Sequence, residues 1–192
     1  MKKPKSNKKW VATVTVSAFI ISVLLGLITN TVVRDLSVMI AFVVLILVVL
    51  LGIVFDIIGM AVATATEAPF HAKSSKRVKG AKESLALIRN AEKVSSFCND
   101  VIGDIAGVIS GGLAATIAIS VHMNLPFLTA LGANLLMTAT VSAATVGGKA
   151  LGKNVAISES YYIVEKCGIV IYSFKRIFAI SKKKRDNTYE DS

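Results

Sequence analysis

The sequence is poor in cysteine, in tryptophan and in recognisable catalytic motifs. Its two cysteines, Cys98 and Cys167, show no CxxC spacing, so no disulfide framework is indicated. It has one tryptophan, and no motif interleaves aromatic residues with its basic blocks, so nucleic acid is not an expected partner despite the net charge of +10. GxSxG, HExxH and phosphate-binding glycine-loop motifs are missing as well. We therefore do not expect an enzyme.

Lysine and arginine are missing from one long stretch, Val94 to Gly148. Asp100 and Asp104 are its only ionised groups, and the spacing of one helical turn places both on the same helix face. Glycine recurs at every fourth residue from Gly103 to Gly111, a pattern that lets another helix approach closely. Two acids in an apolar segment without a cation are costly, so we expect a positive group or ion to compensate them.

Apolar residues are abundant instead, at 54% of the chain with a mean hydropathy of +0.66. This composition predicts an all-α polytopic membrane protein. Four membrane-spanning helices are expected, over about 10–29, 38–58, 99–121 and 127–146. Asn99 or Asp100 is expected to cap the third span, and the Gly147-Gly148 pair to end the fourth.

The polar segments predict the remaining organisation. Residues 1–37 form a basic tail, an extra first span and a turn, and 71–93 form a basic helical insertion within a transmembrane domain that covers 38–153. Residues 154–180 predict amphipathic juxtamembrane helices and 181–192 a disordered tail. With four spans, one side holds every Lys and Arg except Arg34, or 21 of the 22. This asymmetry predicts a multi-pass plasma-membrane protein with both termini in the cytoplasm.

Three short motifs, in order, give the chain a resemblance to a transporter family. Residues 64–68 read Thr-Ala-Thr-Glu-Ala, Asn99-Asp100 precedes Gly103-Asp104, and residues 149–153 read Lys-Ala-Leu-Gly-Lys. This layout resembles the transmembrane domain of the cyclin-M and CorB/CorC magnesium transporters. There are departures, because Thr145 stands at the family's glutamate and Gly148 at its proline. The chain also ends where the family's paired CBS domains should begin.

The resemblance implies a module that binds or transports a divalent cation such as Mg²⁺, and it implies a homodimer. The expected ligands have oxygen donors, which Mg²⁺ prefers. They are Thr64, Thr66, Asn99, Asp100 and Asp104. A separate cytoplasmic subunit would then supply regulation.

Other interpretations stay open for the same residues. Asn99 and Asp100 would serve as helix caps, and Thr64 and Thr66 would bond their own backbone. Asp56 and Glu67 would lie in water or pair with a lysine of the middle helix. The chain would then be a membrane scaffold or accessory subunit that does not transport. A lipid-binding protein is the third interpretation, in which the basic helix anchors to anionic lipid.

Overall fold

The computed structural model describes residues 12–13, 15–17, 19–24, 26–27, 37–124 and 127–190, with side chains described as far as residue 177. In these residues the regular secondary structure is all helical, without strands, which confirms the all-α class. Parts of the predicted first span (10–11, 14, 18, 25 and 28–29) and all of 30–36 lie outside the described residues, and the described parts of that span are helical. The fourth transmembrane helix therefore stays a prediction.

Three of the described helices are long and apolar enough to cross a membrane, which indicates a membrane protein. The first is α2 (Val38–Thr64). The second runs from Ala91 to Asn124 and consists of α5 (Ala91–Ser96), the π-helix η1 (Phe97–Ile102) and α6 (Gly103–Asn124). The third is α7 (Ala130–Ser158).

Two predicted helix boundaries are wrong. Asn99 and Asp100 do not cap a helix, because the helix that contains them starts at Ala91 and continues through η1. The Gly147-Gly148 pair does not end α7, which continues to Ser158. Glycine costs a helix only about 0.5–1 kcal/mol relative to alanine. At Gly148 it makes room for a neighbour, since a Cβ there would lie 2.3 Å from Cδ1 of Ile53.

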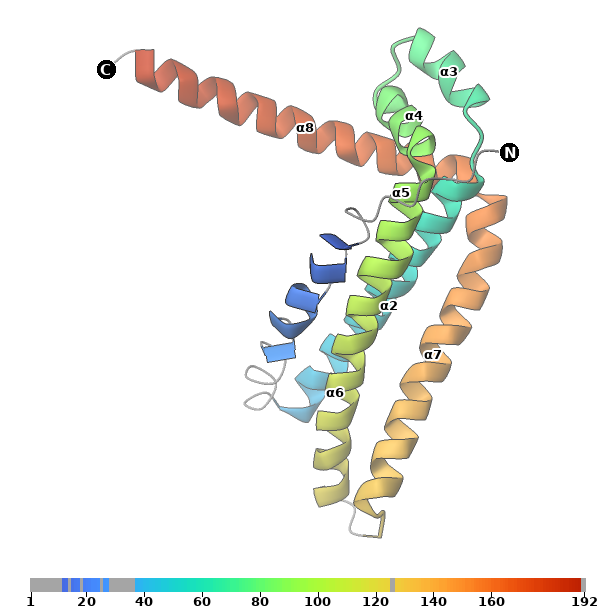
Figure 1. The fold of residues 1–192 in the computed structure, drawn as a ribbon, viewed down its shortest axis with the longest axis vertical. Coiled ribbons are helices and arrows are strands. Elements are labelled where there is room, and N and C mark those ends of the chain that lie inside the picture. Colours follow the sequence, from blue (N-terminus) through green and yellow to red (C-terminus); the bar gives the residue numbers. More distant parts are fainter. Residues whose placement is uncertain are drawn as a thin grey trace. The chain divides into compact units, whose positions relative to one another are not determined.

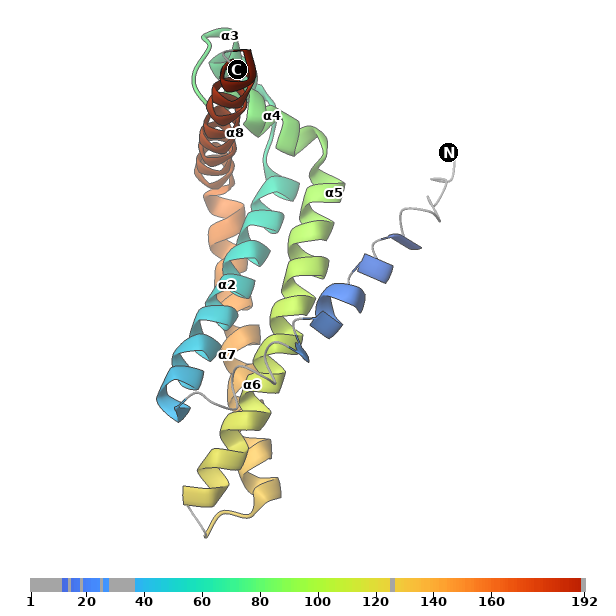
Figure 2. The ribbon, with the colours of Figure 1, turned by 90° about the vertical axis from the view of Figure 1, so that its left-hand side faces the viewer.

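The chain divides into two compact units. Unit 1 comprises residues 1–56 and 98–151. In it α2, α6 and α7 lie side by side (Figures 1 and 2). Ala41 and Leu45 of α2 are buried with Leu113 and Ile117 of α6, and Met137 and Val141 of α7 pack against them.

Unit 2 comprises residues 57–97 and 152–192. It contains α3 (Ala68–Ser75), α4 (Ala81–Arg89), α5 and α8 (Ser160–Glu190). Its core joins Phe70, Leu85 and Val164, and the Phe70 ring centroid lies 5.1 Å from that of Tyr161. The predicted amphipathic region, 154–180, is divided between the end of α7 and α8, and α8 continues to Glu190, so residues 181–190 of the predicted disordered tail are helical. Helix α8 is not among the candidate spans found in the described residues.

Two glycines bring α4 and α8 into close contact within unit 2. Gly80, just before α4, has φ +82°, and a Cβ there would lie 2.7 Å from the backbone nitrogen of Ile169. A Cβ on Gly168 would lie 2.6 Å from the carbonyl oxygen of Gly80. The Ser84 hydroxyl, fully buried, donates a hydrogen bond of 3.1 Å to the carbonyl of Val164. The loop before α4 is therefore fixed directly against the α8 backbone.

Candidate functional site

The ionised side chains of the described part of unit 1 all lie at one end of its helices. Asp56 lies in the second half of α2, Asp100 and Asp104 near the start of the segment that becomes α6, and Lys149 in the second half of α7. The short link between α6 and α7 makes these two helices antiparallel neighbours. The start of α6 and the end of α7 therefore meet, and we take this polar end as the candidate site.

An ion pair across two helices belongs to this end. Lys149 Nζ of α7 lies 3.4 Å from Asp56 Oδ1 of α2, with 17% of the Asp56 side chain exposed. The same Nζ lies beside Gly103 of α6, where a Cβ would be 3.4 Å away. Asp56 does pair with a lysine, but the partner comes from α7 and not from the middle helix. No local sequence pattern indicates this pairing, because the two residues are far apart in the chain.

The π-helix η1 carries two of the predicted cation ligands, Asn99 and Asp100. Short π-helical segments inside α-helices occur frequently at functional sites. Oδ1 of Asn99 is buried and has no hydrogen-bond partner among the described residues. A buried polar atom without a partner costs about 1–3 kcal/mol. Such an atom is a candidate to receive a ligand, an ion or a water molecule.

Asp100 and Asp104 lie on either side of a change in helix type. Asp100 is in η1, and Asp104 follows Gly103 at the start of α6. Both side chains are exposed in the isolated chain. The three predicted ligands Asn99, Asp100 and Asp104 thus lie on one continuous helix, and that they hold one cation stays a prediction.

The two predicted threonine ligands belong to unit 2. The Thr64 hydroxyl, at the end of α2, donates to the carbonyl oxygens of Met60 at 3.0 Å and Ala61 at 3.3 Å. This is the backbone bonding that a threonine in a helix commonly makes. Thr66 is exposed in the link to α3. That the threonines join Asn99 and the two aspartates in one shell stays a prediction. No cluster of three or more His, Cys, Asp and Glu side chains suited to a metal occurs in the described parts of the chain.

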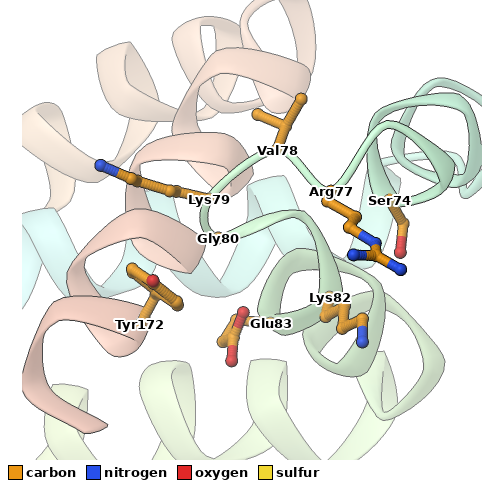
Figure 3. Close-up of a pocket in the computed structure, with 8 residues that line it drawn as sticks. All are labelled: Ser74, Arg77, Val78, Lys79, Gly80, Lys82, Glu83 and Tyr172. Atoms are coloured by element: carbon orange, nitrogen blue, oxygen red, sulfur yellow. The ribbon is translucent and has the colours of Figure 1, made fainter. Parts of the chain in front are cut away.

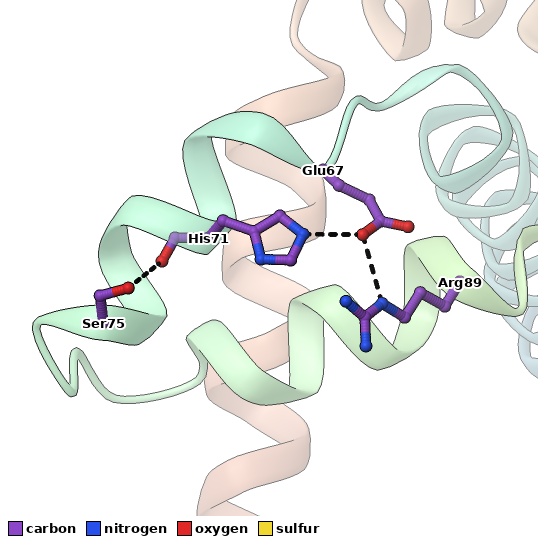
Figure 4. Close-up of polar contacts among 4 residues, drawn as sticks. All are labelled: Glu67, His71, Ser75 and Arg89. Atoms are coloured by element: carbon purple, nitrogen blue, oxygen red, sulfur yellow. Dashed lines mark hydrogen bonds and ion pairs between the residues drawn. The ribbon is translucent and has the colours of Figure 1, made fainter.

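Glu67 has partners of its own within unit 2. Nε2 of His71 lies 2.9 Å from Oε2 of Glu67, and Nε of Arg89 donates to the same oxygen at 3.2 Å (Figure 4). Hydrogen bonds from His71 and then Arg89 lower the pKa of Glu67. The carboxylate thus connects α3 to α4. These contacts account for an acid at position 67 without a bound ion.

Comparison with known proteins gives no relative. No family model, no curated protein and no solved structure matches the chain. The resemblance to the cyclin-M and CorB/CorC transporters stays a prediction that depends on the residues quoted above.

Proposed function

We propose that this chain is a membrane module that binds or transports a divalent cation of the Mg²⁺ type at the polar end of unit 1. Asp100 and Asp104 supply the negative charge, and Asn99 supplies a neutral oxygen. The module lies in the plasma membrane with both termini in the cytoplasm, and a separate cytoplasmic subunit regulates it.

The unpartnered Oδ1 of Asn99 carries this proposal. An amide oxygen, two carboxylates and water are ligands that suit Mg²⁺. The π-helix positions the amide oxygen where it is shielded from solvent but has no protein donor among the described residues. Lys and Arg are absent from the stretch Val94 to Gly148, which contains both acids.

Small residues of unit 1 support a homodimer as part of the proposal. A groove of about 200 Å³ runs between α6 and α7, lined by Gly107, Ser110 and Gly111 on one side and Thr138 and Ser142 on the other. A Cβ on Gly107 or Gly111 would meet nothing within 4 Å. A small-residue groove of this kind allows the close approach of a helix from a second copy.

The test is the melting temperature of the detergent-purified protein, titrated with Mg²⁺, Ca²⁺ and Na⁺. A ligand that binds only the folded form at 100 times its Kd stabilises it by about 2.7 kcal/mol. We expect a saturable rise with Mg²⁺ that Asp104→Asn abolishes. Glu159→Gln, which changes another exposed acid in the same way, should keep the rise. A melting temperature that ignores Mg²⁺, or a rise that survives Asp104→Asn, would count against the cation site.

The second candidate is a membrane scaffold or accessory subunit that does not transport. The ion pair between Asp56 and Lys149 favours it, because this pair neutralises two of the polar-end charges inside the fold. The backbone bonds of Thr64 favour it too. A scaffold predicts no Mg²⁺-selective stabilisation, so the same titration separates the two functions.

A further inference from the structure

Unit 2 has a pocket of about 430 Å³ around the loop that joins α3 to α4. Its polar lining is mostly basic and hydroxylic, and α8 contributes one aromatic side chain. The lining residues with polar heads are Ser74, Arg77, Lys79, Lys82, Glu83 and Tyr172.

The pocket gathers several cations of unit 2 that no acid among the described residues neutralises. Lys73 pairs with Glu165, Arg89 with Glu67, and Lys175 with Glu83. In the part of unit 2 whose side chains are described, Arg77, Lys79 and Lys82 form no ion pair. Glu83, the only acid among the described lining residues, already pairs with Lys175. The pocket therefore has an uncompensated positive charge.

The loop that presents these cations is rigidly held. Helix α3 ends in a Schellman motif, with the Val78 nitrogen donating to the carbonyl of Lys73 and the Arg77 nitrogen to that of Ser74. Arg77 occupies the left-handed position, at φ 54°, which glycine usually takes in this motif. Three residues later, Gly80 fixes the loop against α8. Arg77 thus keeps a strained backbone conformation, although its side chain forms no ion pair with the described residues of unit 2.

The side chains in the pocket suit a phosphate group. Figure 3 shows the guanidinium of Arg77, the hydroxyl of Ser74 and the ammonium of Lys82 on the same side of the loop, whereas Lys79 extends away from them. Guanidinium groups bind phosphate through paired hydrogen bonds, and lysine adds a point charge. A preformed loop with two such groups loses little entropy on binding.

We propose that this pocket binds a phosphate monoester, which either an anionic lipid headgroup or a soluble molecule would carry. This site is independent of the cation site of unit 1.

The experiment measures the melting temperature of the full chain in detergent against three probes: dioctanoyl phosphatidic acid, dioctanoyl phosphatidylcholine and inorganic phosphate. The test variant is Arg77→Gly with Lys82→Gln. Glycine suits the left-handed position, so this variant keeps the fold while it removes the cation. The control variant, Lys153→Ala with Lys166→Ala, removes two exposed charges of the same unit that do not line the pocket.

We expect phosphatidic acid to raise the melting temperature saturably and phosphatidylcholine to leave it unchanged. The test variant should weaken the apparent affinity for phosphatidic acid at least tenfold, and the control variant should not. An equal response to inorganic phosphate, with the same dependence on the variants, would support the phosphate site but assign it to a soluble carrier. The absence of any response, or a response that the test and control variants alter equally, would overturn the proposal.

Discussion

Replacing Gly80 with alanine should strongly destabilise unit 2. At φ +82° an L-residue pays about 1–2 kcal/mol for the left-handed conformation. The added Cβ would also lie 2.7 Å from the nitrogen and 2.8 Å from the Cα of Ile169, backbone atoms that move only with α8. Overpacking of this kind typically costs about 1–3 kcal/mol. The total, about 2–5 kcal/mol, corresponds to a fall in melting temperature on the order of 10 °C.

The two cysteines allow each unit to be followed separately by labelling with a thiol-reactive dye during heating. Cys98, which is 5% exposed, belongs to unit 1, and Cys167 belongs to unit 2. Burial raises the pKa of Cys167, so its thiol should react slowly until unit 2 opens. With Cys98→Ala in the background, Gly80→Ala should bring the labelling of Cys167 to a lower temperature.

Gly112 provides the matched control for this glycine substitution. It lies inside α6 with nothing within 4 Å of a Cβ, so Gly112→Ala should leave stability unchanged or raise it by up to about 1 kcal/mol. Labelling of Cys98, with Cys167→Ala in the background, measures this. If Gly80→Ala melts within about 2 °C of its parent, the close contact between the loop and α8 is refuted.

Two further predictions concern ion pairs. Lys149→Met leaves the largely buried carboxylate of Asp56 without its partner and should destabilise unit 1 by about 1–3 kcal/mol, measured by Cys98 labelling. If Asp56→Asn in the same chain does not restore part of the loss, the ion pair does not stabilise the unit. The pKa of Glu67 is lower in the folded chain than in the unfolded chain, where it is about 4.3. The ionised carboxylate therefore stabilises the fold above this pH, and the stabilisation is lost as the pH falls through the folded pKa. Below about pH 5, the melting temperature followed by the helical circular dichroism signal should therefore fall less in Glu67→Gln than in the parent, and equal pH profiles would contradict this.

The sequence predicted the helical class and the approximate positions of three apolar helices, because long apolar runs have few alternative structures. It misplaced helix ends where a local signal competed with packing. Asn99 and Asp100 have the chemistry of helix caps, yet the preceding segment continues the helix from Ala91. Gly147-Gly148 has the signature of a helix break, yet Gly148 accommodates Ile53 of a neighbouring helix. Tertiary contacts of this kind are not visible in a single sequence.

The candidate site could be predicted only in part. Asp100 and Asp104 were evident because the stretch Val94 to Gly148 has no Lys or Arg. Nothing local revealed the π-helix, since its register depends on how the whole helix packs. The sequence also did not predict the ion pair between Asp56 and Lys149. Nor did it predict the left-handed conformation of Arg77 at the end of α3, where glycine is the usual residue. Each of these features depends on residues that are brought together by the fold or on a backbone conformation that the residue type disfavours.

Helix lengths place the charged groups of unit 1 near a membrane surface. At about 1.5 Å per residue, α6 rises about 30 Å from Asp104 to Asn124, close to the thickness of a bilayer core. The same rise separates Asp56 from Val38 by about 27 Å and Lys149 from Ala130 by about 28 Å. If the opposite helix ends lie at the far interface, these side chains reach the near interface and avoid the cost of charges at the bilayer centre. A cation held by Asp100 and Asp104 would then lie at the membrane surface. Water there would solvate the two carboxylates after the cation leaves, so that its release would cost less than at the bilayer centre.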